Sequence, residues 1–214
     1  MKNSPSCGMR RIKIYQENGH PHEQRGQGIF TAALQKYYPN LPVEEEGCLN
    51  DDKLYENFVL RVYAYHNFRQ EVLAEPTIHK LIQFHSSYKY VLMAHNQTQY
   101  KALGKHLANL DKSQLDQILI DYQADFMDAL SNSASRENHT NTLMHILGYL
   151  KKTVSAEARQ DIHELILKYH SGEIPLSTTL TLLKHYIKQG GSEYIQAQRY
   201  LEPYPQRLGL ANHI

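Results

Sequence analysis

Two cysteines are the first residues of this sequence that could carry chemistry. Cys7 stands in the run SPSCG (4–8), a turn-forming segment just before a predicted strand. A thiol on a loop at a sheet edge can serve as a nucleophile or as a ligand of a metal cluster. The alternative is a Ser, Pro and Gly turn that carries an incidental thiol. Cys48 has no Cys-x-x-Cys partner, so we interpret it as an incidental thiol.

Thirteen histidines raise the question of a metal site, but their spacing does not support one. The sequence has no His-Glu-x-x-His motif, no His pair four residues apart and no carboxylate set with di-iron spacing. Two cysteines are too few to hold a four-iron cluster by themselves. Phosphate-binding Gly-x-x-x-x-Gly-Lys and nucleophile Gly-x-Ser-x-Gly motifs are also absent from the sequence.

His85 and Lys89 interrupt an otherwise apolar face of a helix predicted over residues 77–95. One interpretation is an anion or phosphate site in which the two side chains meet a ligand. The alternative is a hydrogen-bonded core histidine beside a lysine whose ammonium group reaches solvent. Tyr88 and His95 belong to the same predicted helix.

A second group of polar residues follows the predicted helix around residues 139–152, on the side opposite its leucines. Amide and imidazole groups can recognise base edges or ribose, and lysines can contact phosphates. A plain solvated face is the alternative. This group and its flanks comprise Asn138, His139, Asn141, His145, Gly148, Tyr149, Lys151 and Lys152, and a further basic cluster contains Lys184, His185 and Lys188.

The overall composition narrows the class of protein. The 214 residues include 23 Lys plus Arg and 22 Asp plus Glu, a formal charge of +1 that excludes a strongly basic nucleic-acid arm. A chain of this length can bury a core without disulfides. It contains neither an apolar run of about 20 residues nor an apolar signal at its start, so we predict a cytoplasmic protein with no membrane partner.

The elements that would position these residues change in character near Asn50. Residues 10–16 and 41–46 read as strands around a helix at 28–38, and such a unit normally packs in a parallel α/β sheet. Two strands are too few for a parallel sheet, so residues 1–49 are predicted to be an incomplete α/β (strand-helix-strand) fragment of a larger layer.

After Asn50, every segment has helical periodicity. Residues 50–75 are predicted to hold a connecting helix, and residues 76–214 an all-α domain of about seven helices. Glu157 in a first turn and Gly172 at a C-terminal stop mark the helix over residues 155–170. The fold class predicted for the whole chain is mainly α.

Four blocks resemble the YbgA family, a helical domain of unknown function: FHSSYKYVLMAHNQTQYKALGKHLA (84–108), HTNTLMHILGYLKK (139–152), IPLSTTLTLLKHYI (174–187) and YLEPYP (200–205). The front segments SPSCGMRRIKIY, GQGIFTAAL and LPVEEEG resemble the C-terminal part of the thiouracil desulfidase (TudS-like) family. Many bacteria fuse such a part ahead of a YbgA-like domain, and these fusions resemble RudS-type tRNA 4-thiouridine desulfidases.

The resemblance implies an enzyme whose [4Fe-4S] cluster is held by three cysteines and whose open iron takes sulfur from a thiolated base. Cys7 matches the last cluster ligand, and Ser4 matches a serine that assists catalysis. The other two ligands and a catalytic acid belong to segments that would precede Met1, and Cys48 stands where relatives carry Arg. We therefore expect a truncated or mis-started fusion, with no cofactor in this chain alone.

The resulting hypothesis is the C-terminal part of a RudS-like tRNA desulfidase, inactive alone, whose helical domain binds or positions tRNA. One alternative is half of a split or mis-started [4Fe-4S] desulfidase, completed by a separate polypeptide that supplies the N-terminal part. Another is a protein-interaction module in a stress or DNA-repair pathway. The candidate RNA contacts are His85, Tyr88, Lys89, His95, Asn141, His145, Tyr149, Lys151, Lys152, Lys184 and His185.

Overall fold

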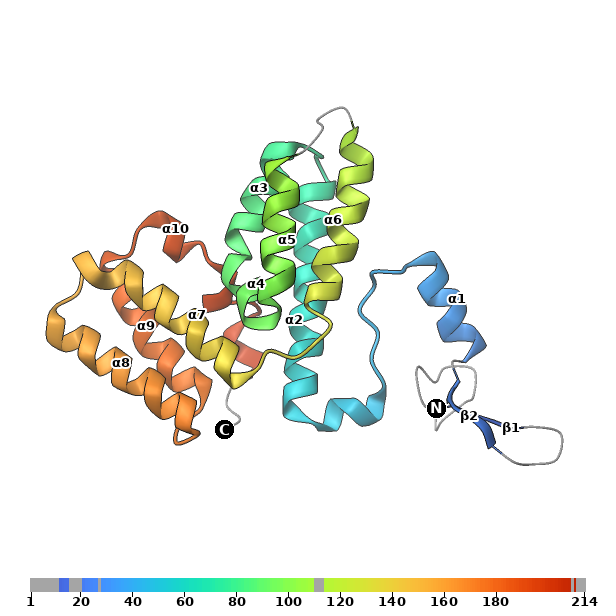
Figure 1. Ribbon diagram of the computed structural model, residues 1–214, viewed down its shortest axis with the longest axis horizontal. Helices are drawn as coiled ribbons and strands as arrows, with labels where there is room; N and C mark the ends of the chain where they lie inside the picture. The colour runs from blue at the N-terminus through green and yellow to red at the C-terminus, as the bar shows by residue number, and fades with distance from the viewer. Residues whose placement is uncertain (1–11, 16–20, 27, 110–113, 209, 211–214) are drawn as a thin grey trace.

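The computed structural model describes residues 12–15, 21–26, 28–109, 114–208 and 210, and they are mainly helical, which confirms the predicted fold class. Figure 1 shows a body of helices from α2 onward, with α1 and a two-stranded hairpin set apart on one side. Within the described ranges, no helix combines the length and the apolar character that a membrane crossing requires. Ser4 and Cys7, the predicted catalytic serine and cluster ligand, lie outside the described residues.

The front of the chain differs from the predicted strand-helix-strand unit. Strands β1 (Ile12–Tyr15) and β2 (Pro21–Gly26) pair antiparallel, and helix α1 (Ile29–Tyr37) follows them. Only five residues separate the strands, enough for a hairpin but too few for a parallel crossover. Residues 41–46 form no strand, because Pro42 has no N–H to donate and consecutive glutamates disfavour pairing.

The remaining helices follow the predicted periodicity closely. Residues 78–196 hold eight α-helices within the described ranges, one more than expected, because one predicted helix is divided. The helices are α2 (Asp52–Phe68), α3 (Ile78–Ser87), α4 (Lys89–His95), α5 (Gln97–Ala108), α6 (Leu115–Ala129), α7 (Arg136–Tyr149), α8 (Ala156–Ser171), α9 (Leu176–Gly190) and α10 (Glu193–Gln196), with a π-helix at Arg69–Leu73 and short 3-10 helices at Glu46–Asn50, Leu150–Lys152, Arg199–Leu201 and Gln206–Leu208.

Local sequence signals explain where several helices begin and end. The Asp51 carboxylate accepts hydrogen bonds from the backbone amides of Lys53 and Leu54 at the start of α2, and the Ser155 hydroxyl accepts one from Ala158 at the start of α8. Such caps satisfy amide groups that have no partner within the helix. Gly172 ends α8 with φ of +86°, a left-handed conformation that favours glycine, which confirms its predicted role.

The predicted helix over 77–95 is divided at Tyr88, whose backbone (φ −94°, ψ 3°) leaves the helical region between α3 and α4. The Tyr88 ring stacks on Phe84 with centroids 4.5 Å apart, and its hydroxyl accepts a hydrogen bond of 2.9 Å from Asn67 Nδ2. Tyr88 is 1% exposed, so core packing fixes this break. As a result, His85 and Lys89 lie on different helices.

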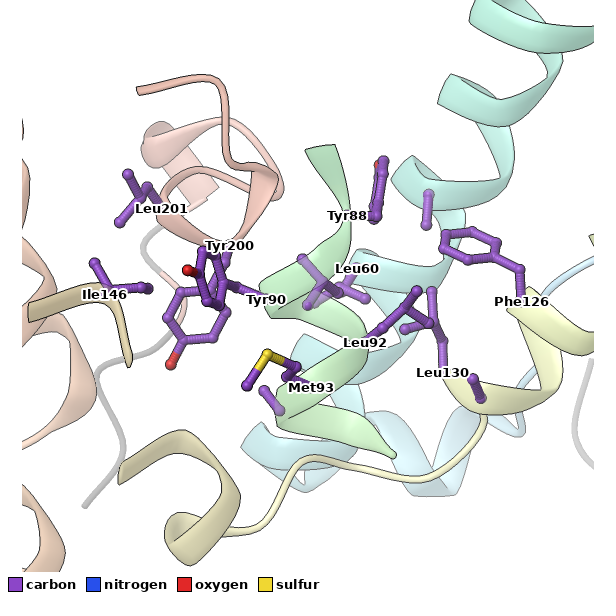
Figure 2. Close-up of a cluster of buried hydrophobic side chains, with 14 of the residues drawn as sticks. Leu60, Tyr88, Tyr90, Leu92, Met93, Phe126, Leu130, Ile146, Tyr200 and Leu201 are labelled. Atoms are coloured by element: carbon purple, nitrogen blue, oxygen red, sulfur yellow. The ribbon is translucent and has the colours of Figure 1, made fainter. Parts of the chain in front are cut away.

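Helix α4 lies at the centre of the core. Its five residues from Tyr90 to Ala94 are all buried, which is typical of a helix surrounded on every side. It contacts α3, α5, α6, α7 and the 3-10 helix Arg199–Leu201. Figure 2 shows Leu92 beside Leu130, the residue that follows α6, and Tyr90 beside Tyr200 and Ile146.

The same core includes α2, through Leu60, Ala64 and Phe68. The Phe68 ring packs against the rings of Phe84 (5.2 Å between centroids), Tyr122 (5.9 Å) and Phe126 (6.4 Å). The boundary at residues 75–76 between a connecting helix and an all-α domain stays a prediction.

Three long-range polar contacts hold the C-terminal segment against this core. Gln198 Nε2 donates to the Ser86 carbonyl oxygen at 3.0 Å, Arg199 pairs with Glu71 of the π-helix at 2.6 Å, and the Tyr204 hydroxyl donates to Glu56 Oε1 at 2.5 Å. Their partners lie 112 to 148 residues earlier in the chain. The segment from Gln198 to Tyr204 therefore closes the fold.

The position of α4 generates the first prediction. Leu92→Ala is expected to lower the free energy of unfolding by about 2–5 kcal/mol, because Leu92 is fully buried and its removal leaves a cavity. Urea unfolding followed by helical circular dichroism measures this. Leu167→Ala on α8 is the matched control, since Leu167 is 46% exposed, and it should change stability by about 0.5 kcal/mol or less. Equal losses in the two variants would contradict the central placement of α4.

Candidate nucleic-acid interface

Four residues from separate helices lie near one surface: Lys89 of α4, Tyr100 of α5, Tyr149 of α7 and Tyr194 of α10. Buried Tyr90 contacts Lys89 and Tyr149, and its hydroxyl interacts electrostatically with those of Tyr100 and Tyr194. We call these five residues the tyrosine–lysine surface. The Tyr149 and Tyr194 rings lie 5.6 Å apart between centroids, with planes tilted by 34°. Lys89 Nζ lies 5.1 Å from the Tyr90 ring centroid and 6.0 Å from that of Tyr194.

The core positions this surface through Tyr90. Tyr90 is 1% exposed, and its ring meets Tyr149 nearly edge-on, at 86° with 6.4 Å between centroids. Tyr149 at the end of α7 is 44% exposed, so its ring is open to a ligand. Tyr194 is half-buried, and the next residue, Ile195, is fully buried and anchors α10 to the core.

The tyrosine–lysine surface combines uncharged tyrosine rings with the ammonium group of Lys89. Burial, together with the neighbouring Tyr149 hydroxyl, raises the pKa of Tyr90, and burial raises that of Tyr194 to about 12. Both phenols therefore keep their protons at neutral pH. Lys89 forms no ion pair with any described carboxylate, and its ammonium group lies near aromatic rings that favour a cation.

His85 lies beside this surface but does not act as a cation. Its ring is nearly parallel to Tyr100 (8°, 5.9 Å between centroids), and its Nδ1 lies 3.0 Å from the Tyr122 hydroxyl. Burial lowers the pKa of His85 to about 4, so the imidazole is neutral at pH 7. These contacts fit the interpretation of a hydrogen-bonded core histidine better than the proposed anion site shared with Lys89.

The predicted residues on α7 lie on the helix that ends in this surface. Asn141, His145 and Tyr149 follow one another at intervals of four residues, so they share one side of α7. Asn141 is half-buried and His145 is exposed. Lys151 is exposed two residues after Tyr149, whereas the side chain of Lys152 lies outside the described residues.

Four other predicted contacts lie elsewhere. The Tyr88 ring is buried in the core and is not open to a base. His95 and Lys184 line a separate cleft. His185 is exposed on α9, with its Nε2 3.0 Å from the amide nitrogen of Gln189.

Sequence reasoning missed Tyr90, Tyr100 and Tyr194. A count of 16 tyrosines without tryptophan was visible, but it does not indicate which rings meet. Tyr90 and Tyr194 are more than a hundred positions apart in sequence, and only tertiary packing brings both to Lys89.

The described residues do not test the cluster that the resemblance implies, because Cys7, its only matched ligand in this chain, lies outside them. Among them, no group of three or more His, Cys, Asp or Glu side chains has an arrangement that could hold a metal ion. Cys48 is half-buried in the 3-10 helix Glu46–Asn50. We therefore derive no step through an iron–sulfur cluster from these residues.

Comparisons with known proteins agree on one family. The family model described as "Protein of unknown function (DUF1722)" matches residues 89–205, a range that begins at Lys89 and contains the whole tyrosine–lysine surface. The "Uncharacterized protein YbgA" of Escherichia coli (strain K12) is 32% identical over 163 residues, which cover 76% of this chain and 96% of that protein. No solved structure matches.

The neutral state of His85 generates a pH prediction. Its pKa is about 4 in the folded chain and about 6.5 when unfolded, so the unfolded state takes up a proton first as the pH falls. We expect the free energy of unfolding to fall between pH 6.5 and pH 4, with up to about 2 kcal/mol from His85 at pH 5, and no such contribution above pH 6.5.

Urea unfolding at pH 7 and at pH 5 measures this difference within each variant. His85→Gln should reduce the loss of stability between the two pH values, and His145→Gln, at an exposed position of α7, should leave it unchanged. An unreduced loss in His85→Gln would contradict the neutral, buried imidazole.

Proposed function

Since this chain belongs to the family described as "Protein of unknown function (DUF1722)", whose description assigns no activity, we propose that its helical domain binds RNA. The observation that carries the proposal is the tyrosine–lysine surface, where the partly exposed Tyr149 ring lies 5.6 Å from the Tyr194 ring and the ammonium group of Lys89 is near.

This combination matches how proteins bind unpaired nucleotides. Bases stack on tyrosine rings, and lysines compensate the charge of the adjacent phosphates. Lys89 and the exposed Lys151 supply that charge locally, so a formal net charge of only +1 does not oppose the proposal. Asn141 and His145, along the same side of α7, add hydrogen-bonding groups for ribose or base edges.

We propose further that the RNA is a tRNA and that the chain acts in the cytoplasm as the C-terminal part of a RudS-like 4-thiouridine desulfidase. The resemblance of the SPSCG segment and the two other front segments to the TudS-like family supports this proposal. The helical domain then positions the tRNA, and Ser4 and Cys7 belong to the catalytic site.

Helix α1 favours the alternative in which another polypeptide completes the enzyme. Its Ile29, Phe30 and Tyr37 side chains are 85%, 62% and 77% exposed. Exposed apolar groups gathered on one helix are typical of a protein interface.

A protein-interaction module is the remaining alternative. Competition between tRNA and duplex DNA for the helical surface separates this alternative from RNA binding.

Substitution at the tyrosine–lysine surface tests RNA binding. Tyr149→Ala is expected to weaken tRNA binding by about 5- to 150-fold, because stacking of a base on an aromatic ring contributes about 1–3 kcal/mol. Lys89→Ala should weaken binding and reduce its salt dependence. Fluorescence anisotropy with labelled tRNA at two salt concentrations measures both effects.

The matched controls are Tyr55→Ala, at a tyrosine 38% exposed on α2, and Lys168→Ala, at an exposed lysine on α8. Both should bind tRNA like the unchanged protein. The proposal is wrong if tRNA does not bind at low salt, or if the control variants lose as much affinity as the surface variants.

A further inference from the structure

A cleft of about 430 Å³ lies between α2, α4, α7, α9 and the C-terminal segment. A smaller hollow of about 70 Å³ shares Glu56, Leu60, His95, His139 and Leu176 with it. The volume falls within the range of sites that bind small molecules. None of the residues of the tyrosine–lysine surface lines this cleft, so it is a separate site.

The walls of the cleft are largely apolar and partly aromatic. The aliphatic side chains come from Leu60, Val91, Leu180 and Leu201. The C-terminal segment contributes the rings of Tyr200 and Tyr204. Leu60, Tyr200 and Leu201 also belong to the buried core, so the cleft lies against it. Such walls favour a flat, uncharged ring as the occupant.

Lys184 provides a hydrogen-bond donor in this apolar setting. It is half-buried on α9 and forms no ion pair with any described residue. Burial lowers the pKa of Lys184, and the Glu202 carboxylate partly opposes this shift. Ser177 and Thr181 line the cleft from the same side of α9, so α9 presents polar groups together.

The opposite polar groups of the cleft are acceptors. His95 Nδ1 lies 2.7 Å from the Asn132 carbonyl oxygen, which only accepts, so Nδ1 carries the proton. Burial lowers the pKa of His95 to about 4, and the neutral ring therefore keeps a lone pair on Nε2. Glu56 adds a carboxylate, which the Tyr204 hydroxyl orients.

The charges of the lining discriminate between ligand classes. Two carboxylates, Glu56 and Glu202, and one ammonium group, Lys184, give the main cleft a net negative charge. This charge disfavours a phosphate group inside the cleft. A ring whose edge carries both donors and acceptors fits the polar groups, because it can donate to a carboxylate or to His95 and accept from Lys184.

We propose that this cleft binds a nucleobase, either as part of a free nucleoside or as one unpaired base of the bound RNA. The second form rests on the proposed function. It is geometrically reasonable because α7 carries His139 at the cleft and Tyr149 at the tyrosine–lysine surface, ten residues or about 15 Å apart along the helix.

The test is a calorimetric titration of the full chain with uridine, cytidine, adenosine and guanosine separately. At least one nucleoside should bind saturably, and Lys184→Ala should weaken that binding at least tenfold. Lys188→Ala, one turn further along α9 at an exposed position, is the control and should leave it unchanged. Circular dichroism checks that both variants remain helical.

No saturable binding of any nucleoside at millimolar concentration, or equal binding by Lys184→Ala, would overturn the proposal. Tyr149→Ala distinguishes the two sites, since it should weaken tRNA binding and leave nucleoside binding intact. Nucleoside binding without tRNA binding would support the cleft and contradict the proposed function. If the nucleoside and tRNA compete, the natural occupant of the cleft is a base of the RNA. If both bind without competition, the occupant is a free nucleoside.

Discussion

The burial of every residue from Tyr90 to Ala94 is the constraint on which the rest of this structure depends. A helix of seven residues is not stable alone in water, and one that is apolar on all sides must be surrounded. Helices α3, α5, α6 and α7 and the 3-10 helix Arg199–Leu201 surround it. The C-terminal segment is therefore part of the core, fixed by its long-range hydrogen bonds to Ser86 and Glu56.

The two ends of α4 explain why candidate binding groups occur where they do. At its start, the Lys89 ammonium group lies near the Tyr194 ring, and the buried Tyr90 ring packs edge-on against Tyr149. At its end, His95 reaches the cleft with its Nδ1 bound to the Asn132 carbonyl. The buried helix α4 supplies residues to both the tyrosine–lysine surface and the cleft. Core packing, rather than loop structure, therefore fixes the positions of these residues.

The sequence predicted those features that local interactions decide. Helix α8 was predicted because its apolar period, the first-turn Glu157 and the stop at Gly172 all act within a few residues. The break at Tyr88 was not predicted, because it depends on a hydrogen bond from Asn67 of α2, 21 residues earlier in the chain. The meeting of Tyr90 and Tyr194 with Lys89 was missed for the same reason. The front of the chain was predicted incorrectly in detail, since strand β2 forms at Pro21–Gly26, a segment without strand periodicity, and residues 41–46 form no strand.

Mapping where RNA touches the protein tests the central claim most directly, namely that the tyrosine–lysine surface built on α4 is the RNA-binding site. The measurement is ultraviolet crosslinking of bound tRNA to the full chain, followed by mass spectrometry of the crosslinked peptides. The account predicts adducts on peptides that contain Tyr149 and Tyr194. Adducts confined to α1 or α8, with none on those two tyrosines, would contradict it.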